Sequence, residues 1–131
     1  MNWTEIAALV AAGFGGFLGL YAMINPAWVS RLVRLAPMEG RVEGRSEFRA
    51  TYGGLFFFSH AFVVWVIFAR EPGADLACGV LGAAWLGTGI GRLVSIAMDR
   101  VATNLNLINM TVENVLGLIL FLPLLAPWLG L

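Results

Sequence analysis

The chain alternates between long uncharged runs and short segments that hold most of its charges. Four runs of 20 or more residues carry at most one charged residue each. Because a helix needs about 20 apolar residues to cross a bilayer, the pattern predicts four membrane-spanning helices. They are expected over about 5–25, 50–69, 76–98 and 110–130. The predicted fold is an all-α integral membrane four-helix bundle, a single transmembrane domain over residues 1–131.

Composition agrees with a membrane location. Hydrophobic residues make up 60% of the chain and charged residues 12%, and the mean hydropathy is +0.83. A soluble domain is typically about 45–50% apolar and about 25% charged. The net charge is zero and all eight basic residues are arginines, which argues against nucleic-acid binding because no broad basic surface is available. The single cysteine, Cys78, excludes an internal disulfide.

The arginines predict the orientation. Five lie between the first two spans: Arg31, Arg34, Arg41, Arg45 and Arg49. By the positive-inside rule this loop is cytoplasmic, so both termini face outward, and we expect the bacterial inner (cytoplasmic) membrane.

The loop itself shows two patterns. "PAWVSRLVRLAP" interleaves apolar residues with arginines, which predicts a short helix in the membrane interface. "EGRVEGRSEFR" repeats glutamate and arginine every four residues. As a helix, this stretch would have a basic face for anionic lipid and an acidic face for a protein partner. A solvated loop is the alternative, because Gly40 and Gly44 weaken a helix.

Glycines recur at helix-packing spacing in two spans. Gly15 and Gly19 in the first span, and Gly87 and Gly91 in the third, form small-xxx-small pairs. Such pairs let two helix backbones approach closely in lipid, so we expect both pairs to be helix contacts.

Two opposite charges stand within the apolar spans. Arg92 lies on a polar stripe of the third helix, and Glu113 stands at a comparable depth in the fourth. An unpaired charge inside the bilayer is costly, so the sequence predicts a direct Arg92–Glu113 contact near the cytoplasmic end, with Tyr52 or Asn114 as a second neighbour.

Other polar residues are predicted to lie at the same end. The expected cluster consists of Arg92, Glu113, Arg49, Glu47, Tyr52, Asn114 and His60. It serves either to lock the helices together or to bind a polar head group or a partner helix. For the only histidine, His60, we expect an interhelical hydrogen bond, with proton transfer or haem ligation as weaker alternatives.

These motifs resemble a bacterial four-helix membrane family of unknown function, similar in architecture to DoxX-like proteins. The resemblance is carried by an "E-x-R-A-x-Y-G-G" entrance to the second span (47–54), by "G-x-G-R" in the third span (89–92) and by Glu113. It implies the fold and the inner-membrane location but no activity. DoxX-like proteins are loosely associated with quinone-linked redox complexes.

Three functions fit these observations. The chain shows no metal-ligand set and no nucleophile placed beside a base, so we expect no catalytic residues, no metal and no cofactor. The favoured function is a non-catalytic accessory or scaffold subunit, with the lipid bilayer and a membrane protein or a second copy as partners. The alternative is a binder or transporter of a lipophilic molecule, such as a lipid or quinone, held by the polar cluster. A lipid-modifying enzyme is the weakest hypothesis.

Overall fold

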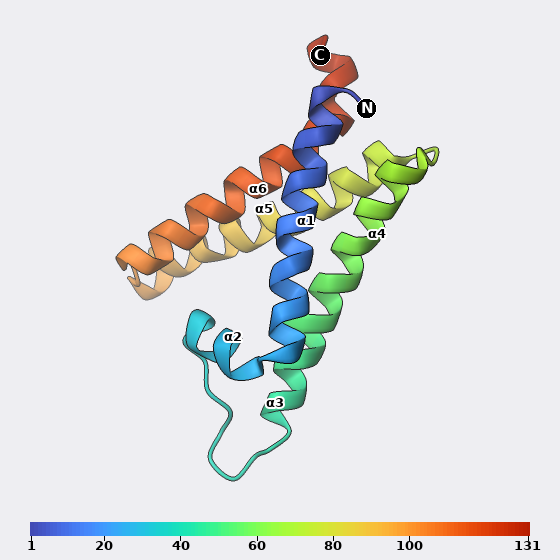
Figure 1. Cartoon of the computed structure of the whole chain (residues 1–131). Helices are drawn as coiled ribbons and strands as arrows, with labels where there is room; N and C mark the ends of the chain where they lie inside the picture. Colours follow the sequence, from blue (N-terminus) through green and yellow to red (C-terminus); the bar gives the residue numbers. More distant parts are fainter. The chain divides into compact units, whose positions relative to one another are not determined.

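The computed structural model describes all 131 residues, and all of its regular elements are helices (Figure 1). In chain order its elements are α1 (Trp3–Ile24), α2 (Pro26–Val33), α3 (Gly44–Glu47), the π-helix η1 (Phe48–Leu55), α4 (Phe56–Ala69), α5 (Ala74–Asp99) and α6 (Asn104–Leu129). Helices α3, η1 and α4 follow one another without a break. The segments long and apolar enough to span a membrane are Trp3–Ile24, Gly44–Ala69, Ala74–Asp99 and Asn104–Leu129.

The four predicted spans are therefore present, and two of them begin earlier than expected. The second starts at Gly44 rather than near residue 50, and the fourth at Asn104 rather than near residue 110. The early start of α6 has a local cause, because the hydroxyl oxygen of Thr103 accepts a hydrogen bond from the backbone N–H of Asn106. Such a cap satisfies one of the backbone donors that a helix start leaves free.

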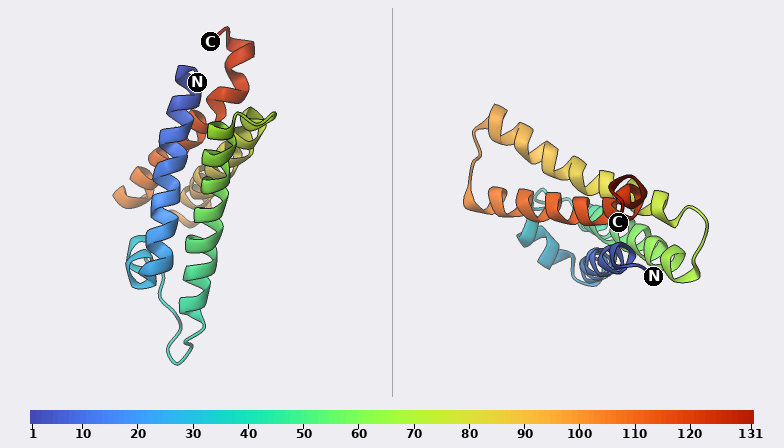
Figure 2. Two further views of the ribbon diagram at one scale, coloured as in Figure 1. Left: turned by 45° about the vertical axis from the view of Figure 1, so that its right-hand side comes forward. Right: turned by 90° about the horizontal axis from the view of Figure 1, so that it is seen from above.

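The chain forms two compact units, which are described separately. Unit 1 consists of Met1–Ala11 and Val66–Leu131, and unit 2 of Ala12–Trp65. In unit 1, α5 and α6 run side by side as a hairpin (Figure 2). In unit 2, the parts of α1 and α4 that belong to it lie side by side, and α2 packs near η1.

Small residues bring α5 and α6 into close contact. A Cβ atom at Gly82 would lie 2.8 Å from the backbone oxygen of Gly117, and one at Gly117 would lie 2.7 Å from Cγ of Leu86. A Cβ atom at Gly89 would likewise meet the side-chain amide of Asn114. Glycines on both helices thus allow the two backbones to approach closely, as is common between helices in membranes.

The glycines that make this contact are not the predicted pair. Gly87 and Gly91 are exposed, and a Cβ atom at either would meet nothing within 4 Å. Gly82 and Gly89 are seven residues apart and share a helix face, whereas Gly87 and Gly91 lie on roughly the opposite face. Gly87 and Gly91 therefore contact no other helix of this chain, because the spacing finds a face but does not say which face meets the neighbour, and a contact of this pair with a second copy stays a prediction.

The predicted Gly15/Gly19 contact is confirmed in unit 2. A Cβ atom at Gly19 would collide with the backbone of Phe57 in α4, and one at Gly15 would collide with the ring of His60. Both glycines are buried, so α1 and α4 approach each other at these positions.

The predicted short helix in the arginine-rich loop is present as α2. The side chain of Asn25 caps its start by accepting a hydrogen bond from the backbone N–H of Trp28 at 3.0 Å. Val29 is buried with Ala22 of α1 and Phe48 of η1. The following residues 34–43 form turns and irregular structure, so the repeat of glutamate and arginine is helical only from Gly44 onward.

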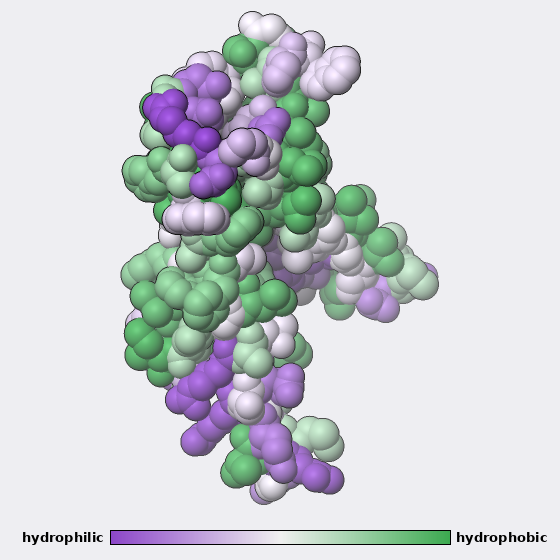
Figure 3. Space-filling view, turned by 90° about the vertical axis from the view of Figure 1, so that its right-hand side faces the viewer, coloured by the Kyte–Doolittle hydropathy of each residue, from purple (hydrophilic) through white to green (hydrophobic).

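The surface of α4 is strongly hydrophobic. Phe58, Phe62 and Trp65 are all exposed. Figure 3 shows hydrophobic side chains over the middle of this face and hydrophilic ones at its lower end, where the loop before α3 lies. Such a face is typical of a helix that contacts lipid or another membrane protein.

Candidate functional site

The predicted contact between Arg92 and Glu113 is present, and it joins α5 to α6. Nε of Arg92 donates to both carboxylate oxygens of Glu113, at 2.9 Å and 2.7 Å. The side chain of Glu113 is 11% exposed and that of Arg92 is 31% exposed. A charge-assisted hydrogen bond in this setting is stronger than one between neutral groups. The charge that would be costly in an apolar helix is therefore paired with its opposite.

Asn106 is the third member of this site. Nη1 of Arg92 donates to Oδ1 of Asn106 at 3.0 Å, and Nδ2 of Asn106 donates to the backbone oxygen of Val101 at 3.0 Å. The second bond orients the amide so that its oxygen faces the guanidinium. Asn106 thus connects the ion pair to the segment between α5 and α6.

Asn106 is absent from the predicted cluster, because the fourth span is predicted to start only near residue 110. One signal in the sequence could have identified it. Asn106 precedes Glu113 by seven residues, which is about two helical turns and places both on one face.

Of the two second neighbours predicted for the pair, Tyr52 belongs to unit 2 and Asn114 does not bond to either charge. Asn114 donates from Nδ2 to the backbone oxygen of Met110 at 2.7 Å and packs against Gly89. Its amide is therefore bonded to its own helix and its side chain fills the space beside a glycine. The prediction of Asn114 as a partner of Arg92 is wrong, and Asn106 takes that role.

The polar stripe around Arg92 is satisfied within α5. The hydroxyl of Thr88 donates to the backbone oxygen of Trp85 at 2.7 Å, and that of Ser95 donates to Asp99 at 2.7 Å. Short polar side chains in helices commonly bond in this way to a residue one turn away. These hydroxyls bond within their own helix, whereas the ion pair and Asn106 form a polar connection between α5 and α6.

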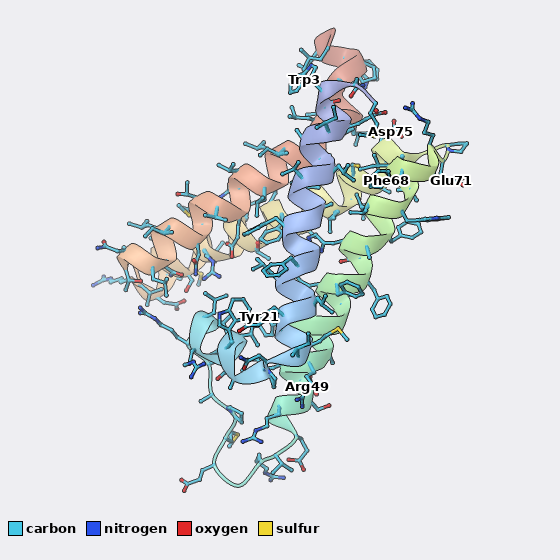
Figure 4. All side chains as sticks on the ribbon, in the orientation of Figure 1. Trp3, Tyr21, Arg49, Phe68, Glu71 and Asp75 are labelled. Atoms are coloured by element: carbon cyan, nitrogen blue, oxygen red, sulfur yellow. The ribbon has the colours of Figure 1, made fainter.

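Four of the predicted cluster residues belong to unit 2. Nε of Arg49 donates to the backbone oxygen of Met23 at 3.1 Å, which ties η1 to the end of α1 (Figure 4). Tyr52 packs against Phe48, with ring centres 5.7 Å apart, and Glu47 is exposed. Tyr52, Arg49 and the two glycines of the "E-x-R-A-x-Y-G-G" motif lie on the π-helix η1. π-Helical turns are rare and are often found at functional sites.

His60 is the fourth of these residues and is only 1% exposed. Its Nδ1 lies 2.6 Å from the backbone oxygen of Phe56, one turn earlier on the same chain segment, and its ring stacks on Phe56. The ring packs over Gly15 of α1. The histidine therefore fills the contact between two helices, and that contact needs glycine on the opposite side.

The family of the chain follows from the comparison of its sequence. A family model described as a domain of unknown function, DUF4345, matches residues 3–124. The chain belongs to this family. No curated protein and no solved structure matches it. The match includes all four candidate spans up to residue 124 and every residue of the ion-pair site. This DUF4345 chain is a multi-pass membrane protein by the length and composition of its helices.

Proposed function

We propose that this DUF4345 protein is a non-catalytic accessory or scaffold subunit of a larger complex in the bacterial inner membrane. The observation that supports this proposal best is the geometry of Arg92. Its Nε is bonded to Glu113 and its Nη1 to Asn106, so the strongest polar group within the spans serves to hold α5 to α6. In this function the ion pair is a clamp that fixes a helical hairpin for partner proteins.

The outward faces of the spans support an assembly role. The exposed aromatic side chains of α4 need either lipid or a partner helix. Lipid would cover the whole of this surface, whereas a bound subunit would cover a defined part of it. The sequence motifs resemble those of DoxX-like proteins, and we extend this resemblance to propose a partner in a quinone-linked redox complex.

The location of the loop completes the proposal. Leu32 and Leu35 are exposed next to Arg31 and Arg34. Because α2 directly follows a candidate span, we place it in the cytoplasmic interface, with these leucines in the head-group region and the arginines near lipid phosphates. Both termini then lie on the outer side of the membrane.

One observation favours the alternative function, binding of a lipophilic molecule with a polar head group. A guanidinium has five N–H donors, and Glu113 and Asn106 engage those on Nε and Nη1 only. With 31% of its side chain exposed, Arg92 retains donors for a phosphate or a quinone oxygen. In this function the clamp doubles as a head-group site.

Native mass spectrometry separates the two functions. The tagged protein is purified in mild detergent from the cells that make it, beside an unrelated four-span membrane protein with the same tag. An accessory subunit is expected to emerge in a complex of fixed stoichiometry that the control lacks. The double variant Arg92→Leu with Glu113→Gln should keep that complex.

A head-group binder gives a different result. It would emerge without other subunits but with a retained lipid or quinone, and the double variant would lose that molecule while remaining folded. A protein that carries neither subunit nor ligand would contradict both functions.

A further inference from the structure

Arg92 has N–H groups that the chain itself does not use. Glu113 accepts from the one on Nε, and Asn106 accepts from one on Nη1. One N–H on Nη1 and both on Nη2 remain, because a guanidinium has five donors. The side chain is 31% exposed, so these donors lie at the surface of the span. A donor without an acceptor is costly in a bilayer, so a molecule outside the chain must supply the acceptor.

The guanidinium is directed toward the loop between α5 and α6. The two helices form an antiparallel hairpin in which Gly89 packs against Asn114. Continued toward the loop, this register places Asn106 opposite Ala97, about five residues beyond Arg92. The bond from Nη1 to Asn106 therefore draws the head of the arginine along α5, away from the middle of the span.

This level corresponds to the edge of the hydrocarbon. Helix α5 has 26 residues. Its length is about 39 Å at about 1.5 Å per residue, whereas the hydrocarbon is about 30 Å thick. A centred helix therefore extends about three residues beyond each side, which places the boundary near Ile96. The guanidinium lies between the levels of Arg92 and Ala97, so the acceptors within its reach are the phosphate and ester groups of phospholipids.

The surface beside Arg92 has room for an acyl chain. Thr88 and Gly91 are exposed on α5, and a Cβ atom at Gly91 would meet nothing within 4 Å. The hydroxyl of Thr88 donates to the backbone oxygen of Trp85, so it needs no further polar partner. An acyl chain that runs from the guanidinium toward the middle of the bilayer would pass over these two small residues.

The surroundings of the guanidinium are neutral as a whole. The charge of Arg92 is compensated by Glu113. At the end of α5, Asp99 accepts from the hydroxyl of Ser95 and is followed directly by Arg100. Net charge therefore does not attract an anion here. Recognition depends instead on the planar fork of N–H donors, whose geometry matches two oxygens of a phosphate.

We propose that the free N–H groups of Arg92 bind the phosphate of a phospholipid whose acyl chain lies over Gly91. The inference rests on the head-group function given above as the alternative, and it names a phosphodiester lipid as the ligand of that site. The lipid completes the hydrogen bonds of the guanidinium and so becomes part of the connection between α5 and α6.

Two lipids that differ only in the head group test the role of the phosphate. The full-length protein is stripped of lipid in dodecyl maltoside and titrated with dioleoylphosphatidylcholine or with dioleoylglycerol, which lacks the phosphate. Phosphatidylcholine carries no net charge, so the arginines before α4 contribute little. Native mass spectrometry gives the two affinities. Phosphatidylcholine should bind about tenfold or more tightly, because its phosphate accepts charge-assisted hydrogen bonds. Equal affinities would overturn the proposal.

A variant beside the arginine tests the position of the lipid. Gly91→Leu fills the open space without touching α6, and it should weaken the binding of phosphatidylcholine severalfold. Gly13→Leu is the matched control in α1, where a Cβ atom also meets nothing within 4 Å, and it should leave the affinity unchanged. Circular dichroism establishes that both variants fold. Wild-type affinity in Gly91→Leu would place the lipid elsewhere and contradict the proposal.

Two further ligands separate this inference from the function on which it rests. Glycerophosphocholine, the head group without acyl chains, should bind far more weakly than phosphatidylcholine; equal binding would show that the site takes a soluble phosphodiester and not a lipid. Decylubiquinone carries carbonyl oxygens but no phosphate. If it is retained and phosphatidylcholine is not, the head-group function stands and the phospholipid is wrong. If neither is retained, both the inference and the head-group function fail.

Discussion

Gly82 of α5 faces Gly117 of α6 so closely that a Cβ atom on Gly82 would lie 2.8 Å from the Gly117 backbone oxygen. A backbone oxygen cannot move away as the end of a flexible side chain can. The contact between the two helices therefore depends on the absence of a side chain at this position.

Gly82→Leu is accordingly expected to destabilise the protein. Overpacking a close contact typically costs about 1–3 kcal/mol, and here it would also separate the helices that carry the ion pair. Thermal unfolding in detergent, followed by circular dichroism, measures the loss. Gly91→Leu is the matched control on the same helix, because a Cβ atom there meets nothing within 4 Å. Because Leu has a higher helix propensity than Gly, Gly91→Leu should not destabilise α5, and an equal loss in both variants would contradict the Gly82–Gly117 contact as the cause.

This pair also shows what could be predicted from the sequence. The spans could be predicted because hydrocarbon tolerates few charges, and the Arg92–Glu113 contact because two opposite charges at one depth need each other. The helix face that carries Gly82 and Gly89 could not be separated from the one that carries Gly87 and Gly91, since both have helical spacing. Only the packing of α6 decides between them.

The local structure at the helix starts could also not be predicted from the pattern of apolar runs. Asn104 and Asn106 have low helix propensity and are typical of loops, yet the cap by Thr103 extends α6 over them. The same limit applied to the second span, whose first turns include the π-helix η1. Residues of the site that lie on these extensions, such as Asn106, could therefore not be predicted from the apolar runs.

The arginines of the loop lead to a prediction on lipid preference. Arg41 and Arg45 are exposed beside exposed Met38 and Val42, a combination suited to an anionic membrane surface. Each arginine near such a surface contributes about 1 kcal/mol, so Arg41→Gln with Arg45→Gln should weaken the preference for anionic lipid by about tenfold or more. Exchange of labelled phosphatidylglycerol against phosphatidylcholine in nanodiscs measures it at moderate salt. Glu39→Gln with Glu43→Gln is the control, and it should strengthen the preference.

Topology gives a separate prediction. With the arginine-rich loop in the cytoplasm, both ends of the chain lie outside. Alkaline phosphatase, which is active only outside the cytoplasm, should therefore be active when fused after Leu131 and inactive when fused after Met38. Green fluorescent protein at the same two positions should give the opposite pattern. Fluorescence from the fusion at Leu131 would reverse the orientation proposed for the protein.

The ion pair gives the last prediction. Arg92→Leu leaves the carboxylate of Glu113, 11% exposed, without its partner. An unpaired charge within a span costs roughly 2.5–3.5 kcal/mol on insertion scales, so this variant should lose much of the protein's stability. Arg92→Leu combined with Glu113→Gln removes both charges and should recover most of the loss, since the penalty lies in the unmatched charge and not in the absence of the pair.

A double-mutant cycle measured by thermal unfolding tests this coupling, with three further variants to locate its source. Arg100→Leu, at an exposed arginine just after α5, should change little. Asn106→Ala should cost less than Arg92→Leu, because it removes one acceptor of the guanidinium and leaves the ion pair intact. Asn114→Ala should leave the coupling between Arg92 and Glu113 unchanged, because its amide bonds to Met110. Strictly additive losses at Arg92 and Glu113 would show that the two charges are uncoupled, and the clamp between α5 and α6 would then rest on the glycine contact alone.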